Sequence, residues 1–155
     1  MHITAKIDYA VRTLLEIAHS AQHGGNAALK ADAIASAQQI PPKILETILG
    51  ELRRADLVVS RRGPDGGYWL ARPAAQISVA DVIRAIEGPL ASVRGQRPED
   101  VEYTGAARSL QHVWIALRVN IRSVLENVSI AEIALDQLPA FVGALTADSG
   151  AWARR

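Results

Sequence analysis

The sequence predicts a mainly α-helical fold, in which a winged helix-turn-helix domain with a two-stranded wing precedes a long C-terminal dimerisation helix. In residues 42–54, apolar side chains recur at helical spacing between polar ones. Two short β-prone runs follow at once, at 57–60 and 68–70, and the turn between them, RRGPDGG, is rich in residues that allow positive φ. Between residues 110 and 128, apolar residues recur at intervals of 4, 3, 4, 3 and 4, the heptad pattern of a helix packed along another helix.

The composition is that of an ordinary globular chain. Its 155 residues are 49% hydrophobic and 21% charged, which is enough for one core with an appended element. No apolar run approaches the roughly 20 residues of a membrane span, and the N-terminus lacks the layout of a signal peptide. We therefore expect a cytoplasmic protein without a membrane partner. The absence of cysteine excludes disulfides, thiolate catalysis and cysteine-ligated zinc or iron–sulfur sites.

Charge is unevenly distributed along the chain, although the net charge is only +1. Residues 1–97 contain twelve Lys and Arg against nine Asp and Glu, whereas residues 98–155 contain five against seven. The basic surplus therefore falls in the half that contains the helix-turn-helix, as expected for a surface that faces phosphates.

A helix is predicted over about residues 3–21, and the polar segment 23–26 ends it. Its predicted buried stripe consists of Ile3, Ile7, Ala10, Val11, Leu14, Ile17 and Ala18. His19 and His23 are four residues apart, a spacing that can chelate a metal, but a polar helix end is the commoner meaning and we predict no metal site. A short helix at 31–37 and a tight turn then lead into the second helix of the motif.

The helix at 42–54 is the predicted recognition helix. Its apolar stripe consists of Ile44, Leu45, Ile48, Leu49 and Leu52. On the exposed face, Lys43, Glu46 and Thr47 are the candidates for base contacts, because Thr can contact a base edge or a thymine methyl and Glu can accept from cytosine N4. Arg53 and Arg54, at the end of the helix, are better suited to phosphates.

Two further groups of side chains are candidate DNA contacts. In the wing these are Arg61, Arg62 and Gly63, and Arg62 suits a narrow minor groove, where the negative potential is strongest. In the first helix, Thr4, Lys6 and Tyr9 could position the DNA backbone without reading sequence. We find no catalytic constellation, Walker motif or dinucleotide fingerprint, so we do not expect an enzyme.

Two capping boxes begin helices beyond the wing, Ser78 with Asp81 and Ser129 with Glu132. Between them, residues 90–103 are polar and irregular and predict a mobile loop, followed by a helix roughly 30 Å long. The heptad seam of this helix, where we expect a dimer interface, consists of Leu110, Trp114, Leu117, Ile121, Val124 and Val128. A long core helix within one subunit is the alternative.

These elements divide the chain into four predicted parts. They are a winged helix-turn-helix DNA-binding domain at 1–89, an effector or sensor loop at 90–105, dimerisation helices at 106–147 and a frayed tail at 148–155. The loop lies between the DNA-binding domain and the long helix. A small molecule or a protein partner bound there could therefore tilt two recognition helices relative to each other.

Three groups of residues carry a family resemblance. They are Lys6, Tyr9, Ala10, Val11 and Arg12 in the first helix; Leu57, Val58, Ser60, Arg62, Gly63, Pro64, Gly66, Gly67, Tyr68 and Leu70 around the wing; and Asp81, Val82, Ile83, Ile86, Glu87 and Gly88 beyond it. Over residues 1 to about 136, the chain resembles the Rrf2 family of winged-helix bacterial transcription regulators, which includes the IscR, NsrR and CymR types. The resemblance implies a sequence-specific regulator, expected to be a repressor, that binds a palindromic double-stranded DNA operator as a homodimer crossed by the long helix.

The chain departs from this family where a cofactor would bind. Many relatives hold an iron–sulfur cluster with three cysteines in the loop before the long helix, sometimes with a histidine nearby. Aligned on Trp114, Arg108 stands at about the third cysteine and Gln111 at the histidine, with His112 one residue away. We therefore predict no cofactor, and a signal other than a cysteine-ligated cluster. Asp56 also replaces the glycine that usually ends the recognition helix, so it must adopt a left-handed conformation.

A second function remains open from the sequence. A winged-helix module can act through protein contacts alone, without an operator. The arginines of the wing and the polar face of the recognition helix favour the DNA-binding alternative.

Overall fold

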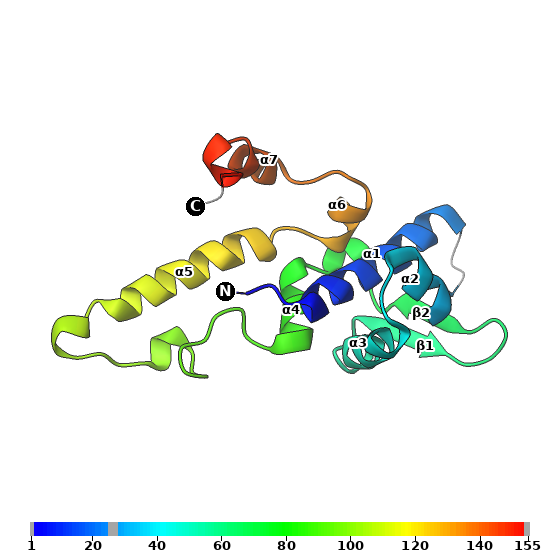
Figure 1. Ribbon diagram of the computed structural model, residues 1–155, viewed down its shortest axis with the longest axis horizontal. Coiled ribbons are helices and arrows are strands. Elements are labelled where there is room, and N and C mark those ends of the chain that lie inside the picture. Colours follow the sequence, from blue (N-terminus) through cyan, green and yellow to red (C-terminus); the bar gives the residue numbers. More distant parts are fainter. Residues whose placement is uncertain (1, 25–27, 154–155) are drawn as a thin grey trace.

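The computed structural model describes residues 2–24 and 28–153 (Figure 1). The helices and strands are α1 (Ala5–Gly24), α2 (Ala31–Gln38), α3 (Pro42–Arg54), β1 (Val58–Arg61), β2 (Gly67–Leu70), α4 (Val79–Glu87), α5 (Leu110–Leu125), α6 (Ile130–Ala134) and α7 (Ala140–Thr146). Short 3₁₀ turns occur at 74–76, 98–100, 105–107 and 149–151. The predicted fold class, mainly α-helical with a two-stranded wing, is confirmed.

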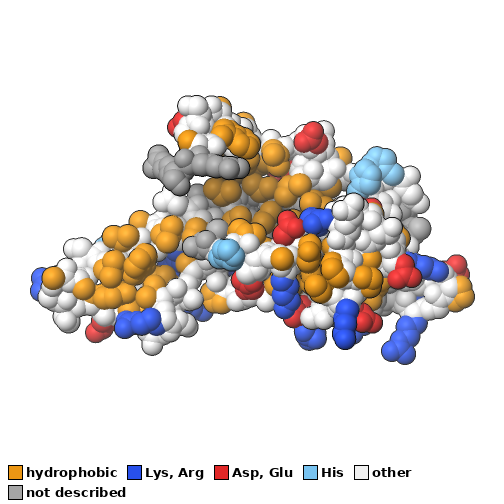
Figure 2. Space-filling model, in the orientation of Figure 1, with side chains coloured by type: hydrophobic (Ala, Val, Ile, Leu, Met, Phe, Trp, Pro, Cys, Tyr) orange, Lys and Arg blue, Asp and Glu red, His pale blue; other side chains and the backbone are white. Residues whose placement is uncertain are grey.

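The elements form two regions of different character. In Figure 1, α1 to α4 and the wing gather at one end, α5 extends away from them, and α6 returns to α1. Figure 2 shows hydrophobic side chains spread along α5, and Lys and Arg side chains along the edge near α3 and the wing. Within the described residues, no helix has the length and apolarity needed to cross a membrane.

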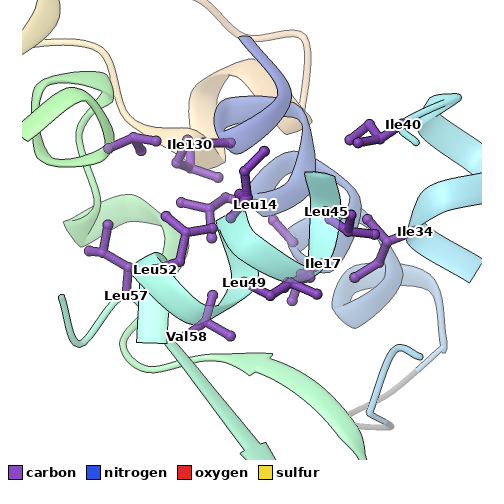
Figure 3. Close-up of a cluster of buried hydrophobic side chains, with 14 of the residues drawn as sticks. Leu14, Ile17, Ile34, Ile40, Leu45, Leu49, Leu52, Leu57, Val58 and Ile130 are labelled. Atoms are coloured by element: carbon purple, nitrogen blue, oxygen red, sulfur yellow. The ribbon is translucent and has the colours of Figure 1, made fainter. Parts of the chain in front are cut away.

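The core lies between α1, α2, α3 and the base of the wing (Figure 3). Leu14 from α1, Ile34 from α2 and Leu49 from α3 are each at most 1% exposed. Burying a side chain of this size stabilises the fold by about 1.5–3 kcal/mol. Ile130 of α6, which follows α5 in the sequence, is fully buried in the same cluster. The core therefore includes α6 together with the N-terminal elements.

Two positions predicted to be buried are exposed. Ile3 is 51% exposed because α1 begins at Ala5, so the predicted first residue of the stripe precedes the helix. Ile44 is 42% exposed. At 100° per residue it lies about a quarter of a turn from the centre of the stripe formed by the buried leucines and Ile48, which places it at the edge of the stripe, next to the exposed Thr47.

The turn between α2 and α3 forms without the usual turn and cap residues. Lys30 makes no side-chain cap to α2, and Gln39 takes the left-handed conformation with φ 52°. Ile40 follows it into the core and is 2% exposed. At the other end of α3, Asp56 has φ 54°, as predicted from the missing glycine. The left-handed conformations of Gln39 and Asp56 cost free energy, and the burial of the next residues, Ile40 and Leu57, offsets that cost.

The wing is an antiparallel pair in which β1 is shifted by one residue from the predicted run, and β2 begins one residue earlier than predicted. Its register pairs Val58 with Leu70 and Arg61 with Gly67, so Arg61 belongs to β1 and not to the tip. Leu29 adds a bridge on the outer side of β2, with hydrogen bonds of 3.1 and 2.9 Å to the backbone of Tyr68. The wing is therefore anchored to the segment before α2 as well as to α3.

Both predicted capping boxes are present. The Ser78 hydroxyl accepts from the backbone N–H of Asp81, and the Asp81 carboxylate accepts from that of Ser78. Ser129 and Glu132 make the same reciprocal pair at the start of α6. However, α6 ends at Ala134, several residues before the predicted end, and a separate helix α7 follows.

Residues 90–103 are irregular, as predicted, apart from the 3₁₀ turn at 98–100, and parts of the segment pack against the rest of the structure; its mobility stays a prediction. Leu90 and Val101 are buried. The Gln111 side-chain amide donates to the backbone carbonyls of residues 98, 99 and 101, at 3.3, 3.1 and 2.8 Å. Trp114 Nε1 donates to the Tyr103 hydroxyl at 3.1 Å. Because the 3₁₀ turn at 105–107 takes the place of the first predicted turn, α5 has 16 residues and is about 24 Å long.

The predicted frayed tail is also partly folded. Asp148 accepts from the Gly150 backbone N–H at 2.8 Å and caps a 3₁₀ turn at 149–151. Trp152 Nε1 donates to the carbonyl of Thr146 at 2.6 Å, which ties this turn to α7. Residues 154–155 of the predicted tail, and residues 25 and 26 of the predicted break after α1, lie outside the described residues.

Candidate nucleic-acid interface

The exposed face of α3 carries the predicted base-contacting residues. Lys43, Glu46 and Thr47 are all exposed, because the buried stripe of α3 faces α1 and α2. The Thr47 hydroxyl donates to the Lys43 carbonyl at 3.3 Å, which fixes the direction of its methyl group. Ile44 lies beside them and was missed as a surface residue. Its exposed apolar side chain has the chemistry to contact a thymine methyl.

Arg53 and Arg54 end α3 where the wing begins. Arg53 Nη1 donates to the Ser60 hydroxyl of β1 at 3.3 Å, so this arginine links the recognition helix to the wing. The guanidinium of Arg54 lies over Gly50, 3.9 Å from where a β-carbon there would be. Both side chains are exposed. Basic residues at a helix C-terminus also interact favourably with the helix dipole.

The wing holds its two arginines differently. The Arg61 guanidinium lies 5.6 Å from the centre of the Trp69 ring and donates to the Asp65 carbonyl at 3.4 Å. Arg62 lies at the exposed tip, followed by Gly63 with φ 107°. The tip is tightly closed, since a β-carbon on Gly66 would lie 2.2 Å from the carbonyl oxygen of Arg61. Glycine is therefore required there for the turn that presents Arg62.

The three residues in and just before α1 that were predicted to contact the DNA backbone make contacts within the protein. Lys6 Nζ forms an ion pair with Glu51 of α3 at 2.7 Å. The Thr4 hydroxyl donates to Glu87 of α4 at 2.5 Å. Tyr9 is half-buried against the core. These contacts give each side chain a role in holding α1 to its neighbours, and their contact with DNA stays a prediction.

Some residues of the predicted seam of α5 pack within the subunit, and others are exposed to solvent. Trp114 is half-buried beside Tyr103, and Ile121 packs against the small cluster around Ile83. By contrast, Leu117 is 45% exposed, and Val113, which lies next to the seam, is 55% exposed. Within the described structure, none of the α5 side chains is fully buried. A helix with this apolar, uncovered stripe is typical of a surface that packs on another helix. Of the other three predicted seam positions, Leu110 and Val124 are half-buried, and Val128, which lies beyond the end of α5, is buried.

The residues around the 90–109 segment do not fit an iron–sulfur cluster. Such clusters are held mainly by thiolates, and the chain contains no cysteine. At the positions aligned with ligands, Arg108 is exposed and cationic, and the Gln111 amide is occupied by three carbonyls. His112 is exposed on α5. Among the described residues, no group of three or more His, Asp or Glu side chains is arranged to hold a metal ion.

Comparisons with known proteins agree with this architecture. The sequence model of the Rrf2 family, described as an iron-dependent transcriptional regulator, matches residues 3–136. An HTH-type transcriptional regulator of Mycobacterium tuberculosis H37Rv is 47% identical over 148 residues, which cover 96% of this chain and 90% of the relative. IscR of Sodalis glossinidius is 36% identical over 138 residues, or 88% of this chain and 81% of the relative. The structure of CymR, the global cysteine regulator of B. subtilis, is similar with a TM-score of 0.73 at 27% identity, over 88% of this chain and 98% of that one.

Proposed function

Because the chain belongs to the Rrf2 family of transcriptional regulators, we propose that it is a repressor that binds a palindromic operator as a homodimer. The observation that supports this most directly is the shared edge of α3 and the wing. It presents Lys43, Glu46 and Thr47 from the helix and Arg62 from the wing tip, all exposed. An enzyme is excluded by the family, whose members are regulators.

The proposed complex follows from the direction of these side chains. The N-terminal half of α3 enters the major groove, where Glu46 and Thr47 meet base edges. Arg53 and Arg54 meet phosphates, and Arg62 reaches the adjacent minor groove. In the dimer, two α3 helices would contact half-sites one turn of DNA apart, about 34 Å, which requires a two-fold symmetric operator.

The uncovered stripe of α5 is the proposed dimer contact. Leu117 and Val113 would pack on the same residues of a second copy, because a two-fold interface pairs a surface patch with itself. A repressor of this kind would bind its operator in the cytoplasm, where the bacterial chromosome lies.

The proposed signal is not a cysteine-ligated cluster. The packed segment 90–105 connects α4 of the DNA-binding domain to α5, so a small-molecule or protein effector bound there would bias the angle between two recognition helices. If the effector binds about 3 kcal/mol more tightly to a dimer with one angle between its recognition helices than to a dimer with another, operator occupancy changes roughly a hundredfold.

Operator binding can be tested with genomic DNA that flanks the gene. Full-length protein is titrated against these fragments by gel shift, in the presence of excess non-specific DNA. We expect one fragment to bind at least a thousandfold more tightly than the competitor, as specific regulators do. A Lys43→Ala, Thr47→Ala variant should lose this preference, whereas Arg108→Ala, an exposed residue outside the interface, should keep it. If no fragment binds better than competitor DNA, the protein is an interaction module and not an operator-binding repressor.

A further inference from the structure

A cavity of about 290 Å³ lies where α4, the segment after it and α5 meet. Four of its lining side chains are arginines, Arg84 from α4, Arg97 from the segment, and Arg118 and Arg122 from α5. Glu99 is the acidic residue in its lining, and Leu90 supplies apolar surface. We call this site the arginine cavity. It lies away from α3 and the wing, and operator binding as described above does not use it.

The acidic residues around the arginine cavity balance only part of its charge. Glu99 accepts from Arg118, and Glu126 accepts from both Arg84 and Arg122, the latter at 2.9 Å. These contacts pair two carboxylates with three guanidinium groups, and Arg97 is the fourth guanidinium group at the cavity. Asp81 is 3.8 Å from Arg84, but it is closer to Arg72, at 3.2 Å, which balances it. The cavity therefore retains an excess of about two positive charges.

Two of the arginines have unused donors. Arg97 takes part in none of the ion pairs found among the described residues, and it is exposed at the cavity. Arg118 Nε is buried and has no hydrogen-bond partner among the described protein groups. A buried donor without an acceptor is costly, and more so when it carries charge. Because Arg118 Nε is not solvent-accessible, Arg97 is the arginine of the cavity whose free donors an anion can reach directly.

We propose that the arginine cavity binds a small dianion of the phosphate-ester or dicarboxylate class. Two negative charges match the excess of the site. Guanidinium groups bind carboxylate and phosphate oxygens through paired donors, which favours these anions over spherical ones such as chloride. A volume near 300 Å³ is at the small end of ligand sites. The surface of Leu90, Pro89 and Ala91 could contact a short aliphatic portion of the ligand.

Such a ligand would contact both α4 and α5, and an effector must act on both of these helices to change DNA binding. Arg84 belongs to the DNA-binding half, whereas Arg118 and Arg122 belong to the proposed dimer helix. A dianion between them would favour one distance between α4 and α5 over others. This regulatory consequence rests on the proposed operator binding, but the binding of the anion does not.

Anion binding is tested on the full-length protein without DNA. Inorganic phosphate and succinate are titrated separately by calorimetry and by thermal melting, with sodium chloride at matched ionic strength as the reference. We expect at least one of the two to bind and to raise the melting temperature above the chloride reference. Binding of phosphate alone identifies the phosphate class, and binding of succinate alone identifies the dicarboxylate class. Equal stabilisation by all three salts would show general screening and overturn the proposal.

Variants locate the site. Arg97→Gln removes an exposed arginine without disturbing an ion pair, and it should weaken anion binding about tenfold or more, as expected for a lost hydrogen bond between charged groups. Arg108→Gln removes the same charge from an exposed position outside the cavity and should bind within about twofold of wild type. Wild-type affinity in Arg97→Gln, or an equal loss in both variants, would refute the assignment. Because no DNA is present, this result is independent of whether an operator exists.

Discussion

Replacing Arg62 by Ala tests the role of the wing with little effect on the fold. The side chain lies at the exposed tip, between the strand residue Arg61 and Gly63. The tip is shaped by Gly63 and Gly66, which the substitution leaves in place. Any loss of binding should therefore come from the missing guanidinium.

The expected loss of binding free energy follows from the presence of two wings in the proposed dimer. An arginine that contacts DNA contributes about 1–3 kcal/mol per site, so the dimer should lose at least about 2 kcal/mol, or roughly thirtyfold in affinity. If each arginine also neutralises one phosphate, the slope of log affinity against log salt should become less steep by about 1.8. A contact with a base edge alone would lower affinity without this change in slope.

The assay is fluorescence anisotropy with a labelled operator at several salt concentrations, with circular dichroism as the check on folding. Arg108→Ala, which removes an exposed arginine just before α5, is the matched control. The reasoning fails if a folded Arg62→Ala protein binds within about threefold of wild type, or if the control loses as much.

Four other predictions concern the dimer, the wing, the signal and acid stability. Leu117→Glu should convert a dimer into monomers in sedimentation, while Val119→Glu, exposed on another face of α5, should leave it dimeric; equal behaviour would place the interface elsewhere. Gly66→Ala should abolish operator binding with the helical circular dichroism retained, since its β-carbon would lie 2.2 Å from the Arg61 carbonyl oxygen; wild-type binding would show that the tip adapts. Protein purified without oxygen should be colourless and its DNA binding indifferent to nitric oxide, and stoichiometric iron with sulfide would contradict this. The Ser129 backbone N–H, and then its hydroxyl, hold the pKa of Glu132 below its ordinary value of 4.5. Because the folded pKa is the lower one, this carboxylate stabilises the fold above its unfolded pKa and ceases to do so as pH falls through the folded pKa; Glu132→Gln should thus be less stable than wild type at pH 7, with the difference vanishing in acid.

Much of the DNA-binding half could be predicted from the sequence because its signals are local. The capping box at Ser78 depends on residues three apart, and the wing on a turn of a few residues. The stripe of α3 was predicted correctly except at its edge. Periodicity identifies the centre of a buried face, but the neighbours decide whether a residue such as Ile44 is covered.

Features that depend on distant contacts could not be predicted in this way. The segment 90–103 is polar and irregular, and its local sequence does not indicate that the Gln111 amide of α5 donates to three of its carbonyls. A lysine such as Lys6 was a candidate for DNA because nothing in the local sequence indicates its ion pair with Glu51, 45 residues away. The arginine cavity was missed for the same reason, since its four arginines come from three separate segments.

The return of the chain to its core has a consequence for how the protein is made. Ile130 completes the core of the N-terminal helices, and its backbone N–H donates to the Ile77 carbonyl at 2.9 Å. A ribosome adds the N-terminal residues first, and domains generally fold as units. The DNA-reading domain therefore cannot reach its final packing until α6 has been synthesised. Because α5 precedes α6 in the sequence, the helix proposed to pair two subunits is synthesised before the core beneath the recognition helix is complete.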